Sequence, residues 1–212
     1  MVKTGARANA LASMLAAAGH RQAEQKLPAP RLPDLAANLA EHIKDHLEAL
    51  GGDRDAAARL RPGSWDLALD GGLLVELDEE LHFNRYRGQI LQAPWASALP
   101  WTKPYLEYCN LEEERCLAAA KWGQRWTNPS CERMFGVASQ PGDFDDGGAP
   151  RWKQRALYDA IKDAFALSQS EHRLARVSVH DIVDGTTLEQ VLRTPTPERG
   201  VAVARLVASR VA

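Results

Sequence analysis

The stretch WDLALDGGLLVELD, Trp65 to Asp78, contains two short alternating segments separated by a pair of glycines. Its alternating apolar residues are Trp65, Leu67, Leu69, Leu73, Val75 and Leu77. A period of two is the pattern of strands that bury one face. The stretch therefore predicts a β-hairpin with strands Trp65–Leu69 and Leu73–Leu77.

The register of this hairpin follows from the requirement that both apolar sets share one face. The numbers of two residues that face each other across the strands must then add up to an even value. A two-residue loop would give an odd value. A three-residue loop, Asp70 to Gly72, gives an even sum, and its glycines can adopt the left-handed conformation that such loops need. This register predicts Asp66 directly opposite Glu76, with Cβ atoms about 5 Å apart, and diagonal to Asp78 at about 7 Å.

Carboxylates gathered on one face repel each other unless a cation lies between them. Mg²⁺ or Mn²⁺ fits such a place, because hard divalent cations prefer oxygen ligands and accept one or two carboxylates with water. Asp66, Glu76 and Asp78 are therefore candidate metal ligands. The alternative is a solvated face whose acids discourage edge pairing, and Glu79 and Glu80 are expected to be strand-end charge of this kind.

The remaining periodicity predicts helices on both sides of the hairpin and one further strand. Helical patterns run from Ala6 to Lys26 and, after a Pro-rich break, from Asp34 to Leu50. Residues 151–167 predict a later helix, Arg173–Val183 a strand, and the residues after Thr186 two last helices, the first capped at Thr186. The expected fold class is α/β, a mixed sheet flanked by helices.

Composition narrows the functional classes. A net charge of −2 provides no global basic field, so nucleic-acid binding would need a local patch. No apolar run approaches the roughly 18 residues of a membrane span, so no membrane partner is expected and the cytoplasm is the expected location. The three cysteines, Cys109, Cys116 and Cys131, have no framework or zinc-site spacing and predict buried thiols.

The order Asp66, turn, Glu76-Leu-Asp78 and His82 resembles the PD-(D/E)XK nuclease superfamily, and within it the very-short-patch-repair-like endonucleases. A second block agrees in order, since the helix KQRALYDAIKDAF and the strand LARVSVHDI resemble the pair that follows the catalytic hairpin. The resemblance covers residues 33–81 and 152–192. It implies a restriction-endonuclease-like core.

Helical patterns at the two ends, together with the resemblance in between, predict a division of the chain into three parts. Residues 1–30 form an N-terminal helix, and residues 193–212 form a C-terminal helical segment. Residues 31–192 form the restriction-endonuclease-like domain, interrupted by a Trp-rich insertion at about 83–151.

Three positions depart from the family pattern. Trp65 stands where the family has proline before the aspartate. Asp78 stands where the superfamily often has lysine, as in some very-short-patch-repair-like relatives, and Glu79 stands where those relatives have glycine.

The resemblance implies Mg²⁺-dependent or Mn²⁺-dependent hydrolysis of phosphodiester bonds. Asp66 and Glu76 would be metal ligands, and Asp78 a ligand or a group that orients the attacking water. The superfamily often adds a glutamate from the helix before the hairpin, for which Glu41 is preferred over Glu48.

Two further side chains are catalytic candidates. His82 is a candidate general acid or base, because its unperturbed pKa is near neutrality; the alternative is a histidine with a backbone partner. Lys153 is a candidate for the missing cation and Gln154 for a phosphate contact, and the alternative for both is the solvated face of a helix.

Arginines beside aromatic residues suit phosphate contacts and base stacking. The predicted nucleic-acid-binding residues are Arg85, Arg87, Trp152, Gln154 and Arg155. DNA is the expected partner, and homodimerisation is left open. Two alternatives to a nuclease remain: an inactive nucleic-acid-binding or interaction module on a nuclease-like fold, and a protein whose acids are only surface and whose Trp-rich segment contacts a partner.

Overall fold

The computed structural model describes residues 5–24, 27–121, 124–169 and 171–212, which divide into two compact units. The sheet unit comprises Met1–Pro28, Ser64–Glu79 and Ser170–Ala212. The helical unit comprises Ala29–Gly63 and Glu80–Gln169. The expected mixed α/β class is confirmed, and the N-terminal and C-terminal helices belong to the same unit as the hairpin.

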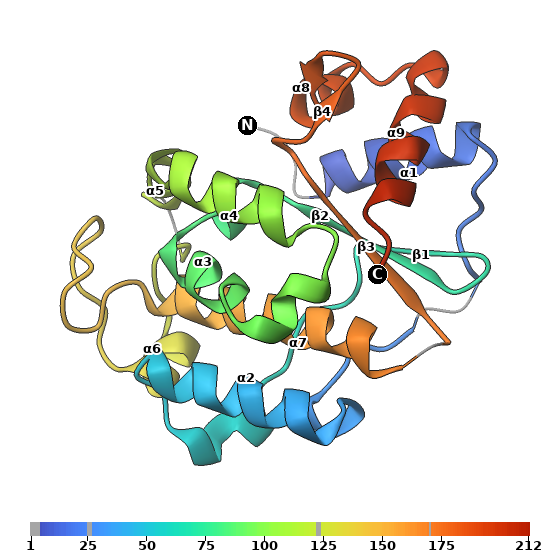
Figure 1. Ribbon diagram of the computed structural model, residues 1–212. Coiled ribbons are helices and arrows are strands. Elements are labelled where there is room, and N and C mark those ends of the chain that lie inside the picture. The colour runs from blue at the N-terminus through green and yellow to red at the C-terminus, as the bar shows by residue number, and fades with distance from the viewer. Residues whose placement is uncertain (1–4, 25–26, 122–123, 170) are drawn as a thin grey trace. The chain divides into compact units, whose positions relative to one another are not determined.

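The sheet unit contains a three-stranded mixed sheet (Figure 1) in the order β1 (Leu67–Leu69), β2 (Leu73–Asp78) and β3 (Arg173–Ser178). β1 and β2 are antiparallel, and β2 and β3 are parallel. Gln22 forms a bridge to the β1 edge at Leu69. The predicted hairpin and the predicted later strand are both confirmed, although β1 is shorter than expected and the later strand ends at Ser178.

The hairpin register is the predicted one, with Leu67 opposite Val75 and Leu69 opposite Leu73. The loop is Asp70 to Gly72, and Gly71 and Gly72 have φ angles of 77° and 75°, in the left-handed region that favours glycine. A Cβ at Gly72 would also lie 2.7 Å from the carbonyl oxygen of Glu171. The glycine pair therefore fixes the loop length on which the register depends.

In this register the alternating leucines of the hairpin point into the core of the sheet unit. The core is covered by α1 (Ala6–Ala17), α8 (Leu188–Arg193) and α9 (Pro197–Ser209), and α1 and α9 pack against each other (Figure 1). A short antiparallel pair, β4 (Ile182–Val183) and β5 (Thr186–Thr187), precedes α8. All charged residues of the hairpin lie outside this core.

Two local expectations need correction. The first helix ends at Ala17 instead of continuing to Lys26, because Gly19 takes a φ of 93° and residues 21–23 then run along the β1 edge. Gln25 and Lys26 lie outside the described residues. The cap of α8 is Thr187 rather than Thr186, since Thr187 exchanges hydrogen bonds with Gln190 in a capping box.

The helical unit is built around α7 (Pro150–Ser168), which contacts helices on several sides (Figure 1). The other helices are α2 (Ala37–Ala49), α3 (Arg85–Leu91), α4 (Thr102–Leu111), α5 (Glu113–Ala120) and α6 (Pro129–Phe135). Short 3₁₀ turns connect them: η1 (Leu32–Asp34), η2 (Arg54–Arg59), η3 (Glu80–His82) and η4 (Pro94–Ala98). Among the described residues, no helix is long and apolar enough to cross a membrane.

The three cysteines are free and buried, which confirms the prediction of buried thiols. All three lie in the helical unit. Burial raises the pKa of the Cys116 thiol to about 12 and also raises the pKa of Cys131. Because the thiolate is the reactive form, these thiols are chemically inert in the folded chain.

We therefore expect none of the three thiols to react with Ellman's reagent in the native protein at about pH 8, where a free thiol reacts readily. All three should react at once in concentrated guanidinium chloride. Released thionitrobenzoate measures both reactions. Rapid native reaction of Cys116 would contradict the packing of the helical unit.

Candidate functional site

Alternation along the hairpin places Asp66, Glu76 and Asp78 on the face opposite the leucines, and β3 adds Arg176 directly opposite Glu76. We call these four residues the acidic face. Asp66 is exposed, whereas Glu76 is 4 % exposed, Asp78 1 % and Arg176 0 %. A strand that buries charge on one face and leucine on the other needs specific partners for the charge.

Asp66 and Glu76 anchor each other's strands. The backbone N–H of Asp66 donates to Oε1 of Glu76 at 3.1 Å, and the backbone N–H of Leu77 donates to Oδ2 of Asp66 at 2.9 Å. Each carboxylate thus reaches across the hairpin to the backbone beside the other. These two backbone N–H donors fix the orientation of both carboxylates.

Asp78 has a different partner. Nη1 of Arg176 lies 2.8 Å from both carboxylate oxygens of Asp78, and both side chains are buried. Among the described residues, Asp66, Glu76 and Asp78 do not bring three ligand atoms within 4.8 Å of one another. The three predicted ligands therefore do not converge as one site, and Asp78 is bound by the guanidinium of Arg176.

Arg176 is a residue that the sequence analysis missed. It stands between Ala175 and Val177 in a strand whose other residues are mostly buried. A charge inside such a run requires an acid on the same face of a neighbouring strand. That requirement is the signal by which the sequence could have indicated an ion pair between this strand and the Glu-x-Asp strand.

Glu79 lies beyond the end of β2, as expected for strand-end charge. Its Oε1 is 3.4 Å from Nη1 of Arg7, whose Nη2 binds Glu189 at 2.8 Å. Arg193 binds the same oxygen of Glu189 at 2.7 Å. These ion pairs link α1 to α8 and to the strand end, so they stabilise the sheet unit apart from the acidic face.

Glu41, the predicted additional metal ligand, lies on the exposed surface of α2 in the helical unit. Its carboxylate oxygens bind Lys44 at 2.6 Å and Arg54 at 2.7 Å. The hydrogen bond from Lys44, followed by the contact with Arg54, lowers the pKa of Glu41. Arg54 also binds Asp45. Glu41 and Asp45 of α2 thus take part in a surface ion-pair network.

His82 ends the turn η3 in the helical unit, and its partner is a side chain rather than the backbone. Nδ1 of His82 lies 2.8 Å from Oδ2 of Asp159 on α7. A carboxylate at one ring nitrogen fixes the orientation of an imidazole. The pair therefore has the geometry of an oriented acid–base group, which keeps His82 a catalytic candidate.

Lys153 is buried inside the helical unit at 7 % exposure, so the alternative of a solvated helix face is wrong. Its Nζ lies 5.5 Å from the ring centroid of Tyr86 and 5.8 Å from that of Phe135. A Cβ at Gly51, just past the carboxyl end of α2, would be 4.0 Å from the same atom. Burial lowers the pKa of Lys153.

Gln154, next to Lys153, is also buried, at 2 % exposure. Its Oε1 accepts hydrogen bonds from Arg151 and from the thiol of Cys131, the latter at 3.8 Å. The predicted phosphate contact is therefore corrected to an internal one, because α7 is covered on this side as well.

The predicted nucleic-acid surface of the helical unit is largely internal. Trp152 is fully buried with its ring 5.1 Å from that of Trp126, so it is not available to stack on a base. Arg87 is buried and binds Asp163 at 2.6 Å. Arg85 is exposed, although it is held by Glu113 and lies 3.5 Å over the ring of Phe144.

Arg155, the last of the predicted nucleic-acid contacts, is half-buried on α7. It donates to the carbonyl oxygen of Leu81 at 3.3 Å. Only Arg85 of the predicted set therefore presents an exposed cation, and α7 does not form the basic and aromatic face that its sequence suggested.

The sheet and its acidic face define a mixed α/β protein with a carboxylate pair on a hairpin. A model described as "Family of unknown function (DUF7255)" matches residues 45–194, and the chain belongs to this family. The matched segment contains the whole acidic face and His82, but not Glu41 or α1. No curated protein and no solved structure matches the chain.

We expect Arg176→Met to lower the free energy of unfolding by about 3–5 kcal/mol, because it leaves the buried carboxylate of Asp78 without its guanidinium. The double variant Asp78→Asn with Arg176→Met should recover most of this loss. Urea denaturation measures all three proteins. Arg193→Met, which removes an exposed arginine and leaves Glu189 paired with Arg7, is the control and should cost less than about 1 kcal/mol. An equal loss in the two arginine variants would contradict a buried pair.

Lys153→Met should make the protein more stable than the parent at neutral pH, because it removes an ammonium that is held in an apolar environment. The pKa of Lys153 is lowered from 10.5 in the folded chain. Between the lowered value and 10.5 the unfolded chain binds the additional proton, so the parent gains stability as pH rises through that window. The advantage of the variant should therefore shrink towards pH 10.5.

Urea denaturation across this pH range checks the prediction. Lys103→Met is the matched control, since Lys103 is exposed and its replacement should not change the pH dependence. A Lys153→Met variant less stable than the parent at neutral pH would show that the ammonium stabilises the fold.

Proposed function

We propose that the protein is a metal-dependent nuclease that hydrolyses phosphodiester bonds in DNA, with Asp66 and Glu76 as ligands of Mg²⁺ or Mn²⁺. The observation that carries the proposal is the reciprocal anchoring of these carboxylates across the hairpin. Two carboxylates completed by water and phosphate oxygens form the ligand set that Mg²⁺ takes with phosphate substrates.

The strand topology supports a restriction-endonuclease-like core. The chain leaves β2 after the Glu-x-Asp segment and forms the helices of the helical unit, of which α7 is the last. It then returns as β3, which pairs with β2 in parallel. Parallel neighbours require such a crossover connection. This order of hairpin, helix and parallel strand is the order that the resemblance implies for the catalytic core.

A divalent cation bound by this pair would polarise the scissile phosphate and lower the pKa of the attacking water. Asp66 is the exposed carboxylate of the pair and would lie on the side from which the substrate approaches. Glu76 is buried and held by a backbone N–H, so it keeps the geometry of the pair. Rigid carboxylates matter here because Mg²⁺ requires nearly ideal octahedral geometry.

Arg176 has a positioning role in this proposal. It lies opposite Glu76 and carries the positive charge that the lysine of the family pattern would supply at position 78. Because it is fully buried against Asp78, it sets the electrostatic potential of the acidic face without touching substrate. The Asp78–Arg176 pair thus stabilises the strands that present Asp66 and Glu76.

The same ion pair favours a second candidate function. Where the superfamily often has lysine this chain has an aspartate, and that aspartate is held by an arginine. An inactive nucleic-acid-binding or interaction module on a nuclease-like fold would keep this pair for stability. Such a protein would bind DNA without cleaving it.

The proposal is tested by incubating plasmid and single-stranded DNA with the parent and with Glu76→Gln in Mg²⁺ or Mn²⁺. The amide keeps an acceptor for the N–H of Asp66 but removes the charge of the ligand. Loss of a group that only supports a metal ligand costs 10–100-fold, so loss of a ligand should lower cleavage by about 100-fold or more. Asp70→Asn, in the exposed turn of the same hairpin, is the control and should cleave like the parent.

Equal cleavage by the parent and Glu76→Gln would overturn the assignment of the site. No cleavage by the parent, with a melting temperature that neither metal changes, would overturn the nuclease itself. DNA binding in that second case would establish the inactive module.

A further inference from the structure

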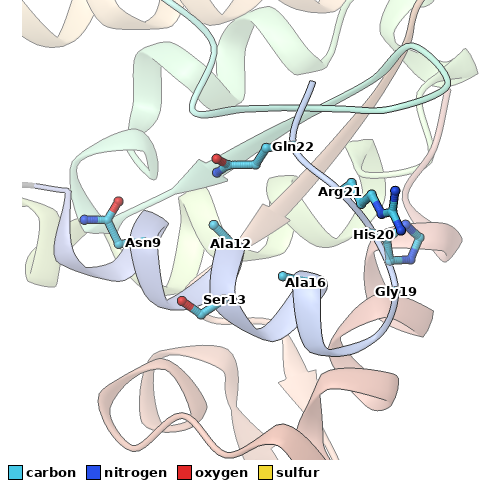
Figure 2. A pocket seen from close by; sticks show the side chains of 8 residues that line it. All are labelled: Asn9, Ala12, Ser13, Ala16, Gly19, His20, Arg21 and Gln22. Carbon is cyan, nitrogen blue, oxygen red and sulfur yellow. The ribbon is translucent and has the colours of Figure 1, made fainter. Parts of the chain in front are cut away.

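An open surface pocket of about 740 Å³, lined by polar and apolar groups, lies on the sheet unit between α1 and the segment that follows it (Figure 2). One wall is a stripe of α1 formed by Asn9, Ala12, Ser13 and Ala16, and the other is formed by residues 19–22. Figure 2 shows the carboxamide of Gln22 facing the stripe, with Arg21 and His20 at the other end. The volume is within the range of ligand-binding pockets.

The sequence of α1 explains why this pocket forms. The stripe residues have helical spacings of three and four, so they share the face of α1 that lies away from the buried Leu11 and Leu15. Alanine and serine fill little of the space beside that face. The opposite wall is rigid, because Asp70 donates its N–H to the carbonyl of Arg21 and Ala23 donates to the carbonyl of Ala68.

A second cavity of about 260 Å³ shares the lining residues Asn9 and Gln22 with the first. It runs along the start of β1 and reaches Asp66. We call the two neighbouring cavities, whose linings together extend from Arg21 to Asp66, the track. Both belong entirely to the sheet unit.

The chemistry of the track fits a nucleic-acid strand. Asp66 is its one carboxylate among the lining residues, and Arg21 provides a permanent cation at the far end. In the described part of the chain, the exposed side chains of Asn9, Arg21 and Gln22 make no hydrogen bond or ion pair with protein groups. Side-chain amides present a donor and an acceptor to base edges, and arginine binds phosphate.

We propose that this track binds a single strand of DNA and leads it to Asp66. The inference deepens the proposed nuclease function, on which it rests, by naming the form of the substrate. In a duplex the Watson–Crick edges are paired, whereas a single strand offers those edges to Asn9 and Gln22. A track only as wide as the gap between one helix and one edge segment also suits a single strand.

The experiment is fluorescence anisotropy in EDTA with a short labelled single-stranded DNA and with the same sequence as a duplex. EDTA prevents cleavage, so binding is measured independently of the nuclease reaction. Ser13→Trp fills the track at an exposed position of α1, and Ala208→Trp is the matched control at an exposed position of α9. Arg21→Gln is matched with Arg205→Gln, another exposed arginine of the same unit.

We expect the parent to bind the single strand at least about tenfold more tightly than the duplex, and Ser13→Trp to lose about tenfold. Arg21→Gln should reduce the slope of log affinity against log salt by about 0.7, the value for one phosphate contact on a single strand. The two control variants should bind like the parent. Melting temperatures and circular dichroism verify that each variant is folded.

Equal binding by Ser13→Trp and Ala208→Trp, equal binding of duplex and single strand, or no binding by the parent would each overturn the track. The expected binding pattern in a protein that cleaves nothing in Mg²⁺ or Mn²⁺ would support the track and overturn the nuclease. Cleavage that depends on Glu76 but is unchanged by Ser13→Trp would support the nuclease and overturn the track.

Discussion

The three-residue turn from Asp70 to Gly72 is the constraint on which the sheet unit depends. Its two left-handed glycines fix the register of the hairpin. That register places the leucines of both strands on the face that packs against α1 and α9. A shift of the β1–β2 pairing by one residue would place Asp66 in the core and expose a leucine. The position of the acidic face is therefore a consequence of core formation, whatever its function.

Four acids in the described part of the chain illustrate two ways of holding a carboxylate. Asp78 and Asp163 are each bound by a buried arginine, Arg176 and Arg87 respectively. Asp66 and Glu76 each accept a backbone N–H of the opposite strand. An arginine brings a compensating charge to its partner, whereas a backbone donor mainly fixes the orientation of the carboxylate.

The sequence was informative where local periodicity determines structure. The hairpin, its register, α7 and β3 follow from alternation, loop length and helical spacing, which are properties of neighbouring residues. It failed on α7, where Trp152 and Gln154 looked exposed. A helix covered on several sides buries polar residues too, and which of them are buried depends on segments that are distant in the chain.

The same limit applies to the ion-pair partners of charged side chains. Glu41 was a reasonable metal ligand by spacing, but Arg54, which comes after the end of α2, binds it. Arg176 was visible as a charge inside an apolar strand, yet its pairing with Asp78 required the parallel register of β2 and β3. Such registers join segments nearly a hundred residues apart, so sequence spacing alone does not indicate them.

The largest local error of the sequence analysis concerns the feature that creates the track. Periodicity predicted a helix to Lys26, because alanine-rich segments favour helix. The left-handed Gly19 ends that helix, and the next residues add to the β1 edge instead. A continuous helix would have left no wall opposite Asn9 and Ser13. The polar track therefore exists because local helix propensity gives way to strand pairing, two residues after α1 ends and on the strand edge that leads to Asp66.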